Sequence, residues 1–282
     1  MFNLKVKNDR GDMLDLTNSP DYTVFKIDGL NPPQATVNKS VNTTSDGSQI
    51  NSVRLESRNI VIYIKLNGVI EDSRLTLYRY FPIKKTVTLY FKNDTRDVCI
   101  CGTVELIECD LFSRSQVAQI SLICPSTYFK AVNDVCTYFS NILPMFSFPF
   151  AISKTGIEFS TIAEEVRKSI INTGDVETGV IIKMFTVGTV VNPTIYNAIT
   201  REQIRLNITL QESDTVIINT NVREKSITLT RDGITTNIIG NMSRNSDWFT
   251  LSAGDNVFTY SAESGQSNLQ ITFTNSILYS GV

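Results

Sequence analysis

Residues 226–239 read SITLTRDGITTNII. Isoleucine, leucine and threonine alternate up to Thr230, and β-branched residues resume around Thr236, so each flank favours a strand. Asp232 and Gly233 lie between the flanks and accept the positive φ angles of a tight β-turn. This stretch therefore predicts a β-hairpin with strands at 226–230 and 236–239.

Short strand-like segments fill the rest of the second half of the chain. Strands are expected at 180–186, 194–199, 203–210, 215–219, 248–251, 257–261 and 269–273, with turn residues between them. So many short strands at this spacing favour a two-sheet antiparallel β-sandwich. One short helix, near 162–171, is expected to lead into it.

The first half is expected to combine strands with one helix. Residues 71–80 have helical spacing at Leu75 and Tyr78, and acidic residues at their start suit a helix N-terminus. Residues 30–57, rich in Asn, Ser and Thr, are interpreted as a long loop with a functional role. The predicted fold class is mainly β (α+β). Strands are expected at 2–6, 59–66, 86–91, 98–108 and 115–124.

The chain is long enough for two domains. Its 282 residues are near the size at which one hydrophobic core stops growing. Pro144 and Pro149 disfavour a regular helix or a central strand between the halves. We therefore expect a first domain at 1–141, a connector at 142–160 and a second domain at 161–282.

Composition excludes several classes of function. The chain contains no histidine, so it can hold no Ser-His-Asp or Cys-His catalytic site and no His-ligated metal. Its 26 basic and 28 acidic side chains give a net charge of -2, which offers no general attraction for phosphate backbones. Sequence-specific nucleic-acid binding is therefore not expected.

No membrane segment or secretory signal is expected. The longest apolar stretches, 60–66 and 176–191, are too short or too interrupted to span a bilayer. The N-terminal residues alternate like a strand and lack the apolar core of a signal peptide. We expect the protein to be made and kept in a cytoplasm.

The cysteines, Glu105, Glu108 and Trp248 are interpreted as structural residues and not as catalytic or binding residues. The cysteines are interpreted as buried, reduced thiols, because their count is odd and no second pair matches a metal-site spacing. Glu105 and Glu108, three apart on a strand, are expected on opposite faces and so do not form a catalytic pair. Trp248 is interpreted as a core residue, with stacking on a sugar ring as the alternative. No metal or cofactor is expected. The cysteines are Cys99, Cys101, Cys109, Cys124 and Cys136.

An ordered series of motifs lies between residues 59 and 129. It runs through NIVI at 59–62, SRLTLYRYF at 73–81, TLYFKN at 88–93, GTVE at 102–105, ECDLFS at 108–113 and QISLICPSTYF at 119–129. In this order the motifs resemble the distal tail protein family of long-tailed, siphovirus-type bacteriophages. Ser126 and Thr127 depart from the family's usual Cys-Pro-Asp-Pro-Tyr-Phe ending. The motif residues are Tyr78, Tyr80, Phe81, Gly102, Glu108, Cys109, Asp110, Phe112, Ser113, Cys124, Pro125, Tyr128 and Phe129.

The resemblance implies a structural adaptor at the virion tail tip, assembled in the bacterial host cytoplasm. An N-terminal β domain with one helix would form a six-fold ring, and a galectin-like sandwich would follow it. Implied partners are further copies of the chain, the tail tube protein, the tail-tip hub protein and receptor-binding or baseplate proteins. The resemblance implies no enzymatic activity.

Two other functions compete with the adaptor. A carbohydrate-binding protein would contact the host cell wall through the C-terminal sandwich and would need exposed aromatic residues in a groove. A hydrolase using carboxylates or a cysteine would need acids that converge from distant strands.

Overall fold

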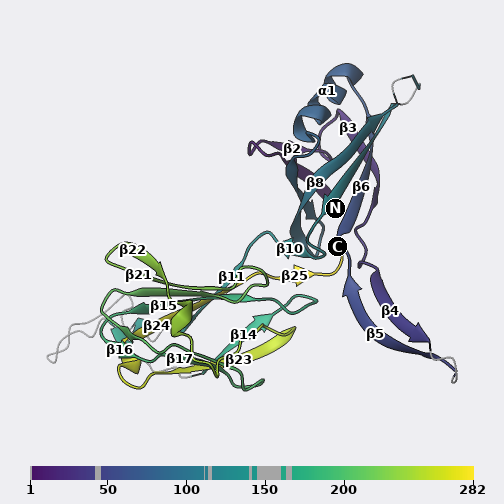
Figure 1. Ribbon diagram of the computed structural model, residues 1–282. Helices are drawn as coiled ribbons and strands as arrows, with labels where there is room; N and C mark the ends of the chain where they lie inside the picture. Colours follow the sequence, from purple (N-terminus) through teal and green to yellow (C-terminus); the bar gives the residue numbers. More distant parts are fainter. Residues whose placement is uncertain are drawn as a thin grey trace. The chain divides into compact units, whose positions relative to one another are not determined.

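The computed structural model describes residues 2–41, 46–110, 112–113, 116–139, 142–144, 160–162 and 167–282 (Figure 1). The chain forms two compact units. Unit 1 comprises Met1–Val132 together with Leu278–Val282, and unit 2 comprises Asn133–Ile277. The sequence placed the first boundary at 141/142, whereas the chain leaves unit 1 after Val132 and returns to it at Leu278. Most of the expected connector, 145–159, lies outside the described residues.

Unit 1 is built on one antiparallel sheet in the order β2-β1-β7-β8-β9-β6-β3, with β10 added against β8 and β25 against β10. Alternation explains these strands, since every second residue of β6, from Ile60 to Leu66, is buried. The expected strands of the first half are confirmed. The bounds are β1 Asn3–Lys7, β2 Met13–Asp15, β3 Tyr22–Asp28, β6 Arg58–Leu66, β7 Thr86–Lys92, β8 Asp97–Cys109, β9 Val117–Cys124, β10 Phe129–Ala131 and β25 Leu278–Tyr279.

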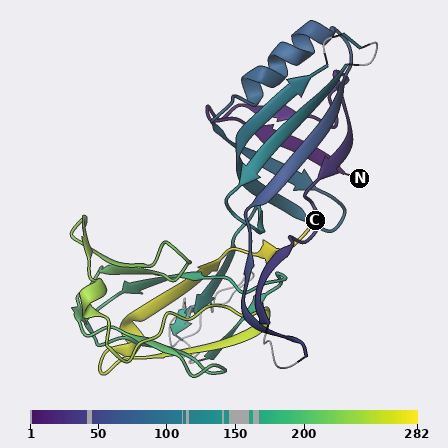
Figure 2. The same cartoon turned by 45° about the vertical axis from the view of Figure 1, so that its right-hand side comes forward.

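The expected helix of unit 1 is confirmed as α1, Ile70–Tyr80. Glu71 and Asp72 lie in its first turn and Arg79 in its last, as the helix dipole favours. Leu77 is fully buried in the core of the unit, so α1 packs through a narrow stripe. Figure 2 shows the helix beside the strands of unit 1.

Residues 30–57 do not form the expected long loop. They contain an antiparallel hairpin of β4, Ala35–Val41, and β5, Ser48–Leu55, with a bulge at Asn51. Nearly every residue of both strands is exposed. The prediction failed because a strand without a buried face has a largely polar composition, which resembles that of a loop.

Unit 2 is a two-sheet antiparallel sandwich, as expected. One sheet has the order β11-β24-β15-β20-β21-β22 and the other β14-β23-β17-β18. Side chains from both sheets form one core that includes Ile182, Ile218 and Phe258. The bounds are β11 Val135–Phe139, β14 Arg167–Asn172, β15 Val180–Thr186, β17 Thr194–Asn197, β18 Gln203–Arg205, β20 Thr215–Asn219, β21 Ser226–Arg231, β22 Ile234–Asn237, β23 Gly254–Ser261 and β24 Leu269–Asn275.

Short elements complete unit 2. Two pairs of short strands, β12 with β13 and β16 with β19, lie outside these sheets, and two 3-10 turns connect strands. Their bounds are β12 Ile142–Pro144, β13 Ser160–Ile162, β16 Val190–Val191, β19 Thr209–Leu210, η1 Ile239–Asn241 and η2 Gln266–Asn268.

The hairpin predicted from Asp232 and Gly233 is confirmed. Arg231 pairs with Ile234, and the two turn residues have φ of 50° and 76°. Two expectations for unit 2 were wrong. The helix expected near 162–171 is contradicted by β14, whose partner β23 lies far away in the sequence and gives no local signal. Residues 248–250 form no strand, although Leu251 makes an isolated bridge with Thr178.

Within the part of the chain that the structure describes, no helix is long and apolar enough to cross a membrane.

Candidate interaction sites

The first group of motif residues joins α1 to the end of β8. The Tyr78 hydroxyl accepts a hydrogen bond from Arg74 at 3.3 Å, and Arg74 also pairs with Glu71. Burial raises the pKa of the Cys109 thiol, while a hydrogen bond with Tyr78 and the charge of Arg74 oppose that rise. A thiol with a raised pKa is a poor nucleophile at neutral pH, so this contact packs the helix on the sheet. Phe81 is fully buried at the helix end, and Tyr80 packs partly buried against the same core.

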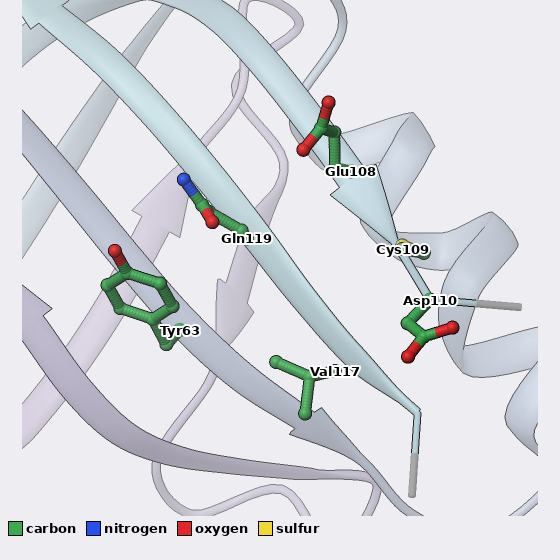
Figure 3. A pocket seen from close by; sticks show the side chains of 6 residues that line it. All are labelled: Tyr63, Glu108, Cys109, Asp110, Val117 and Gln119. Carbon is green, nitrogen blue, oxygen red and sulfur yellow. The ribbon is translucent and has the colours of Figure 1, made fainter. Parts of the chain in front are cut away.

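An open pocket of about 700 Å³ lies beside this contact, on the sheet face opposite the core (Figure 3). Glu108 and Asp110 lie on one side of it, with Tyr63 across from them, while Cys109 lies beside the helix. Its described lining therefore offers two carboxylates and no basic group, which suits a basic or hydrogen-bonding side chain. Its lining residues are Tyr63, Glu108, Cys109, Asp110, Val117 and Gln119.

Glu105 and Glu108 lie on the same face of β8, contrary to the expectation. A bulge between Val104 and Leu106 resets the alternation of the strand. Glu105 accepts a hydrogen bond of 2.9 Å from Ser121, while Glu108 pairs with Gln119 two residues earlier on β9. The register of a bulged strand therefore cannot be read from sequence spacing.

The second group of motif residues surrounds Gly102. A Cβ atom at Gly102 would lie 2.7 Å from the sulfur of Cys124, so only glycine leaves room for this thiol. Burial raises the pKa of Cys124 to about 12. Phe129 is fully buried and meets Phe91 edge-on, with ring centroids 5.7 Å apart. These motif residues are core residues of unit 1.

The remaining motif residues lie in turns. Pro125 is exposed and Tyr128 half-buried, and the carbonyl of Tyr128 accepts a hydrogen bond from Ser126 at 3.0 Å. Phe112 is 99% exposed, and Ser113 follows it in the same turn. The structure therefore does not bring the motif residues together into one site. Most of them pack in or against the core of unit 1, whereas Phe112 and the pocket beside Glu108 and Asp110 are open to solvent.

Arg58 is a further structural residue, and no motif in the sequence indicated it. Its side chain is 4% exposed, and its guanidinium donates to carbonyl oxygens of Gly29, Asn31, Thr127 and Ser280. Backbone carbonyls are present at every position of a sequence and give no pattern, so no signal could have indicated these partners.

The cysteines agree only in part with the expected buried thiols. The five cysteines form no disulfide with one another, but Cys124 alone is buried, whereas Cys101 and Cys136 are exposed. In the described residues no group of His, Cys, Asp and Glu could hold a metal ion.

Trp248 packs partly buried against the core of unit 2. The Lys225 ammonium lies over its ring, 5.5 Å from the centroid, which is within the reach of about 6 Å of a cation–π contact. A sugar would have to displace this lysine in order to stack on the same ring face.

The comparisons with known proteins agree with this architecture. The family model for the siphovirus-type tail component, C-terminal domain, matches residues 173–276, all within unit 2. A search of curated proteins found no match.

Two solved structures are similar over the full length. One is the SPP1 Dit protein, described as a paradigm of the hub adsorption apparatus in phages that infect Gram-positive bacteria, with a TM-score of 0.69 and 12% identity. The other is the phage P2 baseplate in its activated conformation with Ca, with a TM-score of 0.53 and 13% identity. Each match covers 98% of both chains, and at these identities it establishes the fold.

The two-unit β fold and the family match over residues 173–276 together relate this chain to the structural components of siphovirus-type phage tails. Residues 173–276 match the siphovirus-type tail component family, and the resemblance to the distal tail proteins of siphophages is confirmed.

Proposed function

We propose that this protein is a tail-tip adaptor, in which six copies of unit 1 form a ring between the tail tube and the tail-tip hub. Unit 2 would anchor receptor-binding or baseplate proteins, and the protein would act in the virion after assembly in the host cytoplasm. The role is structural and needs no catalytic site.

The proposal of a ring rests mainly on the exposed apolar side chains of the hairpin of β4 and β5. The pairing register places its apolar side chains together on one face, which we call the apolar face. Val37, Val41, Ile50 and Val53 on this face are 46%, 70%, 62% and 59% exposed. The apolar side chains of this face are Ala35, Val37, Val41, Ile50, Val53 and Leu55, and the same register places Lys39 and Ser48 among them.

The opposite face of the hairpin is polar and bonded to itself. Asn38 donates to Ser52 at 3.0 Å, and Thr36 donates to Glu56 at 2.8 Å. A hairpin with one polar and one apolar face resembles a piece of a sheet that covers a core, yet two strands alone are marginally stable in water. The apolar face therefore needs a covering surface, and we assign that role to a second copy of the chain.

Edge strands offer further contacts between copies. The main sheet of unit 1 ends at β2 on one side and at β3 on the other, and two different edges suit the head-to-tail contacts of a closed ring. Phe25, at a bulge of β3, is 57% exposed. An exposed aromatic residue at an edge is typical of a protein interface.

The mass of the purified protein tests this proposal. We expect light scattering to give about 189 kDa, six times the chain mass of 31.5 kDa, and negative-stain images to show rings. A mass of one chain at every concentration, both alone and with tail tube protein added, would contradict the ring.

A further inference from the structure

Arg58 joins four segments of unit 1 that are distant in sequence. Its Nε donates to Thr127 at 3.0 Å, one terminal nitrogen donates to Asn31 at 2.7 Å and to Gly29, and the other donates to Ser280 at 2.7 Å. Gly29 and Asn31 lead into β4, and Arg58 itself follows β5. Both chain segments at the base of the hairpin therefore meet at one guanidinium, together with residue 280.

Backbone carbonyl groups and the Phe129 ring stabilise the positive charge of Arg58. Within the described residues it makes no ion pair, and its guanidinium lies 4.5 Å from the centroid of the Phe129 ring. Burial lowers the pKa of Arg58, although a guanidinium remains charged at any physiological pH. A buried charge is costly unless its donors are satisfied, so each carbonyl partner contributes to keeping this arrangement closed.

A second arginine holds the same returning segment. Arg96 donates to the carbonyl of Gly281, and its guanidinium lies 4.3 Å from the centroid of the Tyr279 ring. The backbone N–H of Val282 donates to the carbonyl of Leu30 at 3.1 Å, immediately before the hairpin.

Residues 278–282 pack closely against the base of the hairpin. A Cβ atom at Gly281 would lie 3.2 Å from the Leu30 carbonyl oxygen, and one at Gly29 would lie 2.1 Å from the Asn59 carbonyl oxygen. Gly29 also has a φ of 90°, which favours glycine. Both approaches therefore depend on the absence of a side chain.

We propose that residues 278–282 are a latch that fixes the hairpin of β4 and β5 in one orientation on unit 1, with Arg58 as its positioning residue. The hairpin strands themselves are exposed on both faces, so their orientation depends on the base. The effect of the latch on assembly rests on the proposed ring, but its effect on the hairpin does not.

The position of the latch at 278–282 means that it is synthesised late. In the sequence, unit 2 comes after β10 and before β25, so the ribosome makes residues 278–282 only after all of unit 2. A chain that stops within unit 2 lacks the latch, and its hairpin stays loosely held. Incomplete chains would thereby be kept out of the ring.

The orientation of the hairpin can be measured by pulsed electron paramagnetic resonance. Spin labels are attached through p-acetylphenylalanine at Gln49 on β5 and Thr86 on β7, a chemistry that avoids the native cysteines. The measurement uses the Val37→Ser/Val53→Ser background, in which a neighbouring copy does not hold the hairpin. The variants are a deletion of residues 280–282 and Arg58→Lys, with Arg79→Lys, an exposed arginine on α1, as the matched control.

We expect a narrow distance distribution in the parent and in Arg79→Lys, and at least a twofold broader one in the deletion variant. Arg58→Lys, which keeps the charge but loses the planar fork, should broaden it as well. If Arg58→Lys does not fold, the deletion alone decides. An unchanged width in the deletion variant, or equal broadening in Arg79→Lys, would overturn the latch. A monomeric wild-type chain would contradict the ring and leave this comparison intact.

Discussion

Two antiparallel hairpins of this chain have different surroundings. In unit 2, β21 continues the sheet beside β20, and its Ile227 and Leu229 are buried in the core. In unit 1, β4 and β5 pair only with each other among the named sheets, and the apolar face is exposed. The difference teaches that a strand pair stabilises its own unit only where its apolar side chains meet a core. Where they do not, the same side chains are available to another molecule.

Removing apolar side chains from the exposed hairpin should have the largest effect on assembly. We expect Val37→Ser/Val53→Ser to shift the mass from the ring to the single chain. Each buried valine contributes about 1.5–3 kcal/mol, so the double variant should weaken each contact by roughly 100-fold or more. Sedimentation velocity measures the shift. Asn38→Ala/Ser52→Ala on the polar face is the control, and equal loss of the ring in both variants would argue against the apolar face.

The same kind of truncation in the other hairpin should affect folding. Ile227→Ala should lower the free energy of unfolding of unit 2 by about 2–5 kcal/mol, because it leaves a cavity in the core. Urea unfolding followed by Trp248, the single tryptophan, reports on unit 2. Val53→Ala should change that free energy by less than about 0.5 kcal/mol. Similar losses in the two variants would remove the distinction between the hairpins.

An ion pair at the turn end of β21 sharpens the comparison. Arg231 donates to Asp214 at 2.9 Å and 2.5 Å, and this hydrogen bonding lowers the pKa of the 1%-exposed Asp214. Asp214→Asn should therefore cost unit 2 about 2–4 kcal/mol at pH 7. A carboxyl with a lowered folded pKa stabilises the fold above its unfolded pKa, near 3.9, and this contribution is lost as the pH falls below that value.

Urea unfolding at pH 7 and at pH 3 measures this dependence. The difference between the parent and Asp214→Asn should shrink at pH 3. A difference that is the same at both pH values would show that the charge of Asp214 does not contribute.

The turn of the unit 2 hairpin should give the smallest effect. Gly233 has a φ of 76°, and no atom lies within 4 Å of a Cβ atom built there. Gly233→Ala should therefore cost about 1 kcal/mol through backbone strain alone. Gly47 in the unit 1 hairpin has a φ of 99° and is equally open, so Gly47→Ala is the matched variant. It should leave the unfolding of unit 2 unchanged, and any loss there would contradict the independence of the two hairpins.

Local signals account for what the sequence predicted. Asp232-Gly233 specifies its turn within two residues, and the alternation of β6 follows from its own buried side chains. The hairpin at 35–55 gave a weaker signal, because Lys39 interrupts the apolar positions of its first strand and a bulge at Asn51 shifts those of its second. A bulge in β8 likewise displaced Glu105.

Long-range contacts account for what the sequence could not predict. The partners of Arg58 are carbonyl groups from 27 to 222 residues away. Nothing in a strand motif indicates that Leu278 returns to unit 1 after the sandwich. Among the motif residues, Gly102 and Cys124 explain each other only when β8 and β9 lie side by side.

Photo-crosslinking from the hairpin tests the central claim most directly. The photoreactive residue p-benzoylphenylalanine is placed at Val53 on the apolar face or at Ser52 on the polar face, and purified protein is irradiated and separated under denaturing conditions. We expect products of two or more chains from Val53, and at most traces from Ser52. Monomer alone from Val53, in protein that sediments as a ring, would show that the apolar face does not bind a second copy.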